Sequence, residues 1–407
     1  MTRRGFLASL GAAAAWLVAT CSPGATVSPA RPTPTAPTIG PTATPTPLLT
    51  TSPAPSPSAA ALRRTIGRML MVGFRGATLD EAPAIAAALA AGELGGIILF
   101  DRDGITGAAG RNIVSPEQLV TLTSDLRTAA LAGPTGQELL IAVDQEGGVV
   151  ARLNPSNGYP ATESQADLGA ADDLDHTTDV AILTAITLNG AGIDVNLAPV
   201  VDLDLNPDNP AIGALDRSFS PDPEVVIAHA TAMIGAQGGA GVKCVIKHFP
   251  GEGSATGNTD EGVVDVTATW TDLELEPFRA LVAAGLPAGV MVGHIRNDRL
   301  DPDHPASLSR PTVTGLLRDE LGWDGVVVSD DLQAHAISQE YGADEPIALA
   351  IEAGVDLLLF ANQQVFDPDI VDHAIATIAG FVESGRISEA RLDQSVDRIE
   401  ALFATVE

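Results

Sequence analysis

The feature that most constrains the fold of this chain is a regular alternation of short apolar segments with longer helical patterns. Eight apolar segments have the length and composition of buried strands: Met69–Phe74, Gly96–Phe100, Leu139–Asp144, Asp194–Leu197, Lys243–His248, Gly289–His294, Gly325–Ser329 and Asp356–Phe360. Helical patterns occupy Pro116–Ala130, Ala181–Asn189, Pro223–Gly238, Leu273–Ala284, Pro311–Glu320, Glu345–Ala353, Asp369–Glu383 and Ser388–Thr405. This alternation predicts a single-domain α/β fold, a (β/α)8 barrel of the TIM type, with a doubly wound open sheet as the alternative.

Polar and ionisable residues stand at the ends of most of these strands. They are Asp101, Asp144, Lys247, His248, His294 and Asp330. A barrel enzyme builds its active site from such strand ends, which favours the barrel. No dinucleotide-binding glycine pattern follows the first strand, which counts against the open sheet.

The N-terminal part of the chain has the composition of a targeting segment. A twin-arginine pattern at residues 2–7, an apolar stretch at Leu10–Ala19 and then Cys21 predict a lipoprotein signal peptide over residues 1–21, with Cys21 lipidated. The alternatives are a plain signal peptide or an N-terminal membrane anchor. Residues 22–60 are rich in Pro, Thr, Ser and Ala and predict a disordered linker before a barrel domain at residues 61–407.

The net charge of −30 excludes nucleic acid as a partner and any membrane contact other than the lipid anchor. The second cysteine, Cys244, lies in a predicted strand and is expected to be a buried thiol. His-x-His, His-Glu-x-x-His and cysteine clusters are absent, so we expect no metal and no cofactor. We expect a monomer in the cell envelope, outside the cytoplasm.

Glycoside hydrolysis requires one carboxylate at the anomeric carbon and one acid at the leaving oxygen. Asp330 is the candidate nucleophile because it ends a Val-rich strand, although Asp330 and Asp331 also read as a helix N-cap. Asp144 is placed to accept hydrogen bonds from sugar hydroxyls, and Arg152, Arg217 and Lys247 to donate them. For each arginine the alternative is a surface ion pair.

Two histidines, His248 and His294, end strands and are candidate substrate ligands, although a strand histidine is often only a satisfied core residue. The glycine-rich segment Gly251–Gly257 lacks the Gly-Lys-Ser/Thr ending of a phosphate-binding loop. It is therefore interpreted as a flexible active-site loop.

Taken together, these segments resemble family 3 glycoside hydrolases, in particular their bacterial β-N-acetylhexosaminidase branch. The matching segments are Gly95–Phe100, Ala142–Gly148 with Arg152, Ala198–Asp202, Asp216–Phe219, Lys247–Gly251, Pro305–Ser309 and Gly325–Leu332. The resemblance implies a barrel and a retaining mechanism with Asp330 as the nucleophile. It also implies that N-acetylglucosamine binds at Asp144, Arg152, Arg217, Lys247 and His248.

The sequence departs from this branch in the loop that carries the general acid/base. The branch usually has Lys-His-Phe-Pro-Gly-His-Gly and then Asp-Ser-His, whose last histidine is the acid/base. Here Glu252 replaces the glycine-flanked histidine, and Asn258-Thr259-Asp260 replaces Asp-Ser-His. Val149 stands where an arginine is usual. One hypothesis makes Asp260, or alternatively Glu252, the general acid, with a pKa raised by burial or like charges.

The function expected from the sequence is that of an exported lipoprotein hydrolase. It would cleave terminal β-linked N-acetylhexosamine, with peptidoglycan fragments as one source of substrate. Two alternatives follow from the altered loop. Loss of the acid/base step would leave a glycan-binding lipoprotein, and a changed acceptor or sugar would make a phosphorylase or a glycosidase of different specificity.

Overall fold

The computed structural model describes residues 57–403, and within them eight parallel strands form one sheet. In chain order they are β1 (Leu70–Val72), β2 (Gly96–Ile98), β3 (Leu140–Val143), β6 (Val195–Asn196), β7 (Lys243–Phe249), β8 (Gly289–Val292), β9 (Val326–Ser329) and β10 (Leu358–Phe360). From β1 to β9 each of these strands pairs with the next one in the chain, and β10 pairs with β1. A short antiparallel hairpin, β4 (Gln145–Gly147) and β5 (Val150–Ala151), follows β3.

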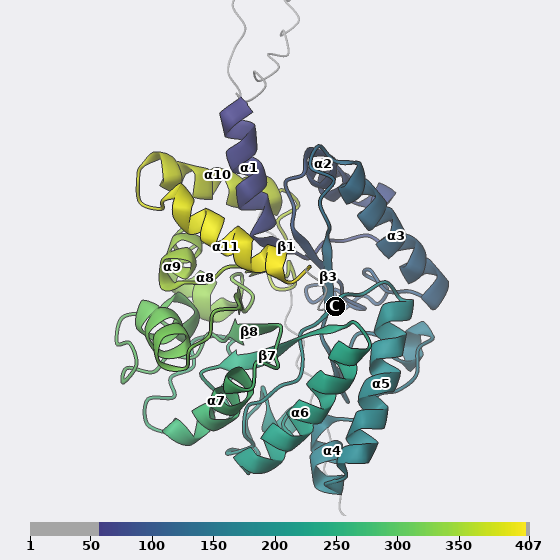
Figure 1. Ribbon diagram of the computed structural model, residues 1–407, viewed down its shortest axis with the longest axis vertical. Helices are drawn as coiled ribbons and strands as arrows, with labels where there is room; N and C mark the ends of the chain where they lie inside the picture. Colours follow the sequence, from purple (N-terminus) through teal and green to yellow (C-terminus); the bar gives the residue numbers. More distant parts are fainter. Residues whose placement is uncertain (1–56, 404–407) are drawn as a thin grey trace, which may run out of the picture. The chain divides into compact units, whose positions relative to one another are not determined.

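The sheet closes on itself where β9 meets the segment that leads into β10. Val328 forms a parallel bridge with Leu357, and the amide of Ser329 donates to the Leu357 carbonyl at 3.0 Å. Together with the β1–β10 pairing, this contact completes the ring of strands that Figure 1 shows inside the helices. The predicted (β/α)8 barrel is therefore confirmed.

The strands are short and apolar because both of their faces are covered. Every residue of β1, β2, β3, β8, β9 and β10 is buried. Side chains fill the inside of the barrel and the helices pack on its outside, which explains the continuous Val, Ile and Leu runs. Cys244 of β7 is a buried free thiol, and burial raises its pKa to about 12.

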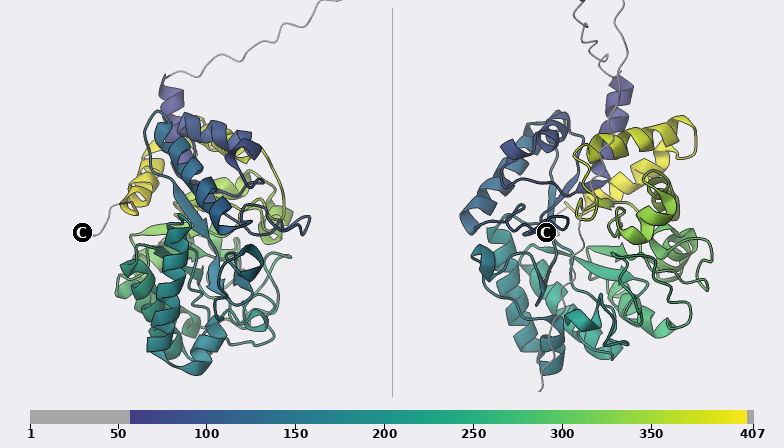
Figure 2. Two further views of the ribbon diagram at one scale, coloured as in Figure 1. Left: turned by 90° about the vertical axis from the view of Figure 1, so that its right-hand side faces the viewer. Right: turned by 180° about the vertical axis from the view of Figure 1, so that it is seen from behind.

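Helices surround the barrel, as Figures 1 and 2 show. They are α1 (Pro57–Arg68), α2 (Pro83–Ala91), α3 (Pro116–Ala132), α4 (Gln165–Ala171), α5 (Leu174–Gly190), α6 (Pro223–Gly239), α7 (Glu276–Ala283), η6 (Pro311–Glu320, a π-helix), α8 (His335–Tyr341), α9 (Glu345–Ala353), α10 (Ile370–Glu383) and α11 (Glu389–Ala401). Short 3-10 turns are η1 (Leu79–Glu81), η2 (Pro155–Asn157), η3 (Gly213–Leu215), η4 (Asp272–Leu275) and η5 (Ala306–Leu308).

Helix starts follow capping signals more closely than apolar periodicity. Asp173 caps α5 through the amide of His176, so this helix begins at Leu174 rather than at the predicted Ala181. Ser115 caps α3 in the same way, and the prediction there placed the first residue correctly. Helix α1 begins at Pro57, inside the segment expected to be linker up to Ala60.

The expected signal peptide at residues 1–21, its Cys21 and most of the linker at residues 22–60 lie outside the described residues. Within residues 57–403, no helix has both the length and the apolar character that crossing a membrane requires.

Candidate active site

The carboxyl ends of the barrel strands surround a cavity of about 420 Å³. Loops after β2, β3, β6, β7, β9 and β10 contribute its walls. The residues predicted from the sequence that line this cavity are Asp144, Arg152, Arg217, Lys247, His248, Glu252, Asp260 and Asp330. The barrel therefore brings together candidates that are far apart in the sequence.

Asp330 follows β9 directly, and its backbone amide donates to the carbonyl of Val292 on β8 at 3.0 Å. One oxygen of its carboxylate accepts the amide of Asp331 at 2.8 Å. Burial opposes ionisation of this carboxyl, but the nearby charges of His294 and His248 outweigh burial and lower its pKa. Asp330 is therefore an ionised carboxylate inside the cavity, as a nucleophile requires.

Unlike Asp330, Asp331 has a structural role. Its carboxylate accepts the amides of Ala361 at 3.0 Å and Gln333 at 3.1 Å, which ties the β9 end to the β10 end. Burial raises its pKa to about 7. The expected N-cap is not observed, because α8 begins only at His335 and Ala334 occupies the capping position.

A network of four charged groups lies at the base of the cavity beside Asp330. Lys247 contacts Asp144 and Glu146, each at 2.7 Å. Arg217 holds Glu146 with two hydrogen bonds of 2.7 and 2.8 Å. Although burial raises the pKa of Asp144 and Glu146, the cations lower the first well below its usual range and the second to about 2. The network is thus fully ionised, and Arg152 joins it through Asp144 at 3.2 Å.

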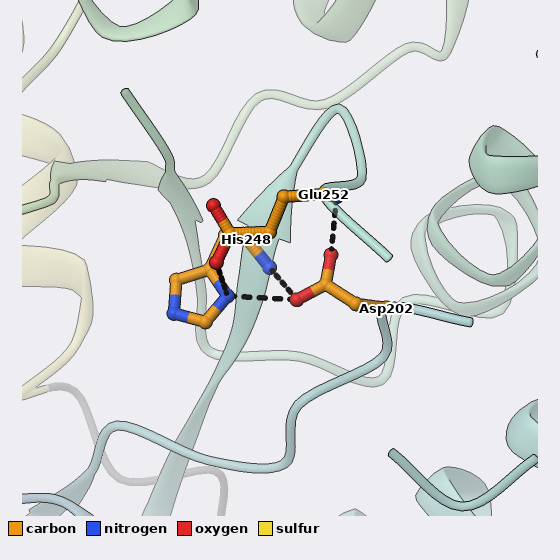
Figure 3. Close-up of side chains that lie close together, drawn as sticks. All are labelled: Asp202, His248 and Glu252. Atoms are coloured by element: carbon orange, nitrogen blue, oxygen red, sulfur yellow. Dashed lines mark hydrogen bonds and ion pairs between the residues drawn. The ribbon is translucent and has the colours of Figure 1, made fainter. Parts of the chain in front are cut away.

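His248 is held by Asp202, as Figure 3 shows. The Asp202 carboxylate lies 2.7 Å from the His248 Nδ1, and it also accepts the amides of His248 at 3.1 Å and Glu252 at 3.0 Å. Because a carboxylate only accepts, Nδ1 carries a proton. Burial lowers the pKa of His248, but the charges of Glu252 and Asp202 outweigh burial and raise it, which favours the imidazolium with a proton on each ring nitrogen. The other ring nitrogen lies 3.4 Å from Arg217. Asp202 thereby fixes the orientation of the ring.

Glu252 is enclosed next to this pair, with one oxygen 3.3 Å from the His248 Nδ1. Burial raises its pKa to about 7, helped by the charges of Asp202 and Asp330 and opposed by His248. A carboxyl with such a pKa holds its proton through part of the neutral range.

Asp260 stands on the loop after β7, exposed at the cavity wall. Gln364, on the loop after β10, donates to its carboxylate at 2.6 Å. Although the residue is exposed, protein atoms shield its carboxyl from part of the surrounding water and so raise its pKa, and the negative charge of Asp330 raises this pKa further. Asn258 accepts the backbone amide of Asp260 at 2.9 Å, so it shapes the turn and does not hold the Asp260 side chain.

His294 is the one predicted substrate ligand that does not line the cavity. It is buried, and its Nε2 donates to the Asp331 carbonyl at 2.8 Å while its Nδ1 lies 2.7 Å from the Ser307 hydroxyl. Both ring nitrogens are engaged with the protein, so His294 supports the segment that carries Asp330.

Sequence reasoning missed the roles of Glu146 and Asp202. Both residues lie in segments that resemble the family, Ala142–Gly148 and Ala198–Asp202, but neither residue ends one of the predicted strands. A buried carboxylate in an otherwise apolar or glycine-rich segment is the signal that could have found them.

Asp202, His248 and Glu252 would also offer ligand atoms to a metal ion, because one atom from each lies within 4.8 Å of the other two. The sequence motifs gave no sign of this set. The three side chains already contact one another, with Nδ1 of His248 at 2.7 Å from the Asp202 carboxylate and 3.3 Å from the Glu252 carboxylate.

A parallel barrel whose mouth gathers the ionised Asp330, three carboxyls of raised pKa and hydrogen-bonded cations is typical of the class of barrel enzymes that act on sugars. Residues 61–402 match the glycosyl hydrolase family 3 N-terminal domain. The chain belongs to this family and is an O-glycosyl hydrolase.

Relatives and solved structures agree with this assignment. Beta-hexosaminidase LpqI of Mycobacterium tuberculosis is 33% identical over 406 residues, which span 97% of this chain and 96% of that protein. Beta-hexosaminidase A of Pseudoalteromonas piscicida is 33% identical over 330 residues, but this chain spans only 53% of its length. The crystal structure of a beta-N-acetylhexosaminidase from Beutenbergia cavernae superposes with a TM-score of 0.75 at 34% identity, over 84% of this chain and 98% of that one.

Proposed function

We propose that this protein is a retaining β-N-acetylhexosaminidase that removes terminal β-linked N-acetylhexosamine, with Asp330 as its nucleophile. The observation that carries the proposal is that Asp330, Asp260 and Glu252 line one cavity at the carboxyl ends of the strands, where their different surroundings shift their pKa values in opposite directions. The pKa of Asp330 is lowered, whereas the pKa values of Asp260 and Glu252 are raised. One ionised carboxylate beside a protonated carboxyl is what glycoside hydrolysis requires. The names of the relatives support the sugar.

In the proposed first step, a carboxylate oxygen of Asp330 forms a bond to the anomeric carbon. The bond from that carbon to the aglycone oxygen breaks, and the general acid gives its proton to this oxygen. In the second step water attacks the glycosyl ester, the former acid removes a proton from the water, and Asp330 is released as a carboxylate. The configuration at the anomeric carbon is retained after two inversions.

Asp260 is our candidate for the acid, with Glu252 as the alternative. A general acid must reach the leaving oxygen on the side where the aglycone departs. Asp260 is exposed at the cavity wall, whereas Glu252 is nearly fully enclosed. The Gln364 hydrogen bond would hold the Asp260 carboxyl in place while the aglycone leaves.

The sugar itself would bind at the charged network. Asp144 would accept from the sugar hydroxyls, and Arg152, Arg217, Lys247 and His248 would donate to them. Because Glu146 and Asp202 fix Arg217 and His248 before substrate arrives, little side-chain entropy would be lost on binding.

The test compares the protein with its Asp330→Ala variant on two substrates, an aryl N-acetyl-β-glucosaminide and a natural β-linked disaccharide. An aryl group departs with little protonation, whereas a sugar alcohol requires the acid. Cleavage of both substrates, lost in Asp330→Ala, is the expected result. Cleavage of the aryl substrate alone would mean that no acid works, and cleavage of neither would favour a glycan-binding protein.

We also propose that the protein is exported and lipidated at Cys21, on the strength of the sequence pattern at residues 2–21. Expression in a host that processes lipoproteins, with an alkynyl fatty acid in the medium, should label the protein but not Cys21→Ser. A Cys244→Ala variant is the matched control, because it also removes one thiol and should keep the label. Labelling of Cys21→Ser would refute the proposal.

A further inference from the structure

A second cavity lies at the end of the barrel opposite the active site. It has a volume of about 570 Å³, and its walls are helix α1, helix α11 and the loop that leads into β3. Helix α1 packs against α11 beside the barrel, as Figure 1 shows. Arg68, the last residue of α1, stands just before β1, and Glu138 stands just before β3. Both residues are therefore at the amino ends of the strands, whereas the sugar site is at the carboxyl ends.

Arg68 is a buried cation that no carboxylate neutralises. The residue is only 7% exposed. Its Nη1 donates to the Glu138 carbonyl at 2.7 Å, and its guanidinium carbon lies 5.1 Å from the centre of the Phe403 ring. Among the residues that the structure describes, however, Arg68 forms no ion pair, and its buried Nε has no hydrogen-bond partner. Burial lowers the pKa of Arg68 despite the charges of Glu400 and Glu138, so these carboxylates do not offset the loss of solvent.

Other arginines of the same chain show what usually lies beside such a guanidinium. Nε and Nη2 form one edge with two parallel donors. Arg75 uses this edge to bind Asp103 at 2.6 and 3.1 Å, and Arg217 uses it to bind Glu146 at 2.7 and 2.8 Å. In Arg68 the described part of the chain supplies no acceptor to this edge. A buried guanidinium of this kind is stabilised when an oxyanion from outside the chain meets it.

Arg64 supplies a second cation to this cavity. It precedes Arg68 by four residues, so both side chains lie on one face of α1. Arg64 is half-buried and, in the described range 57–403, forms neither an ion pair nor a side-chain hydrogen bond. Thr65 brings its hydroxyl to the same wall. The cavity therefore offers a ligand two guanidiniums that no carboxylate occupies and a hydroxyl that can donate.

Two carboxylates limit which anions suit the cavity. Glu138 and Glu400 also line it, but both are exposed, and neither forms an ion pair with Arg64 or Arg68. Because their charges repel an anion, a ligand has to gain more from the guanidiniums than a single carboxylate does. A phosphate group can carry more than one negative charge and presents several oxygens, which lets two arginines bind it at once. A phosphate group is therefore the oxyanion that best matches this arrangement.

We propose that the cavity between α1 and α11 is a binding site for a phosphate group, which Arg68 and Arg64 hold. The source is a free phosphate ion or a phosphodiester, because both present non-bridging oxygens to a guanidinium. The site takes no part in glycoside cleavage, and this inference does not depend on the proposed function.

The experiment measures the binding of inorganic phosphate to the full-length protein by isothermal titration calorimetry. NaCl keeps the ionic strength constant, so that altered screening of the net charge of −30 is not mistaken for binding. Saturable binding is expected. Arg68→Gln should weaken it about ten- to hundredfold, the range of a hydrogen bond to a charged group at a buried site. Arg64→Gln, at a half-buried position, should weaken it about two- to fivefold.

A second titration, with dimethyl phosphate, distinguishes the two sources. Binding that Arg68→Gln weakens in the same way identifies a phosphodiester as a ligand of the site. Binding of inorganic phosphate without binding of dimethyl phosphate identifies the free ion.

The matched control is Arg102→Gln, which removes an exposed arginine from the wall of the sugar cavity. It should leave phosphate binding unchanged. Circular dichroism checks that each variant folds, and if Arg68→Gln does not fold, Arg64→Gln decides. Unchanged affinity in every folded variant of Arg64 and Arg68 overturns the inference, as does the absence of saturable binding to the unaltered protein. Loss of binding in Arg102→Gln would place the phosphate in the sugar cavity and would also overturn it.

Discussion

At the scale of single residues, the roles of Asp260 and Glu252 can be separated by chemical rescue. Asp260→Ala removes the proposed acid and leaves space for a small anion. Cleavage of a β-linked disaccharide should fall by about 10²–10⁴-fold, the usual contribution of general acid catalysis. Azide should accelerate turnover of an aryl substrate by this variant and yield a β-glycosyl azide, because azide needs no general base to attack the glycosyl ester.

The matched control for this prediction is Glu261→Gln, which neutralises the exposed neighbour of Asp260. It should retain disaccharide cleavage and show no response to azide. If instead Glu252→Ala alone loses disaccharide cleavage and responds to azide, the acid is Glu252.

A second residue-scale prediction concerns Glu274, which lies outside the cavity and supports the Gly251–Ser254 turn. Its buried carboxyl accepts the Ser254 hydroxyl at 2.6 Å, and burial raises its pKa to about 7. Between about pH 4.5 and pH 7, the Glu274 carboxyl is therefore protonated in the folded state, whereas in the unfolded state, with the ordinary pKa of 4.5, it has lost its proton. The stability that this group contributes is complete below pH 4.5 and is lost as the pH rises through about 7.

Glu274→Gln should remove this contribution, which amounts to at most roughly 3 kcal/mol between the two ends of that range. The measurement is the free energy of urea unfolding of both proteins between pH 5 and pH 8, compared as a difference at each pH. As the pH rises, the unaltered protein should lose stability relative to Glu274→Gln, so the free energy of unfolding of the variant should increase relative to that of the unaltered protein. The exposed Glu383→Gln serves as the control, and a difference that does not vary with pH would argue against a raised pKa.

At the scale of elements, the end of the barrel opposite the cavity depends on one buried carboxylate. Asp356, just before β10, contacts Arg318 of η6 at 2.6 Å and two arginines of α11, Arg391 at 3.5 Å and Arg398 at 3.3 Å. It also accepts the amide of Val327 in β9 at 3.1 Å. One side chain therefore joins a strand, the π-helix and the last helix.

Asp356→Asn keeps the shape of this side chain but leaves buried cations without a countercharge. It should lower the free energy of unfolding by about 3–5 kcal/mol. Asp324→Asn is the matched control, since Asp324 also pairs with Arg398, at 3.1 Å, but is exposed. It should cost less than about 1 kcal/mol. Equal effects in the two variants would contradict the structural role of Asp356.

The sequence predicted elements better than it predicted contacts between them. Eight strand segments and the strand-end position of Asp330 follow from local apolar runs, which persist because both faces of each strand are buried. The orientation of the His294 ring, which does not face the cavity, cannot be predicted from such a run, because it depends on a contact with Ser307 in a separate segment. The pairing of Glu146 with Arg217 is likewise set by loops that meet only in the closed barrel.

At the scale of the whole molecule, the net charge of −30 means that negatively charged groups repel one another and destabilise the compact folded state. Salt should raise the melting temperature by several degrees between about 0.02 M and about 0.3 M NaCl, because counterions screen this repulsion. Buried pairs such as Lys247 with Asp144 are screened much less and should not reverse the trend. KCl at equal ionic strength should give the same curve, and a melting temperature that falls with salt would show that exposed ion pairs dominate.

The adjacent Gln363 and Gln364 have a consequence for attempts to redesign the protein. Gln364 contacts the loop that carries Asp260, and Gln363 contacts the loop that carries Arg102. If residues 251–264 were replaced by the loop of a relative, the new loop would lie beside Gln364, whose side-chain amide is positioned to bind an aspartate. A productive graft therefore has to include the segment after β10, and because that segment also contacts Arg102 after β2, it links the loops after β2 and β7 into one unit.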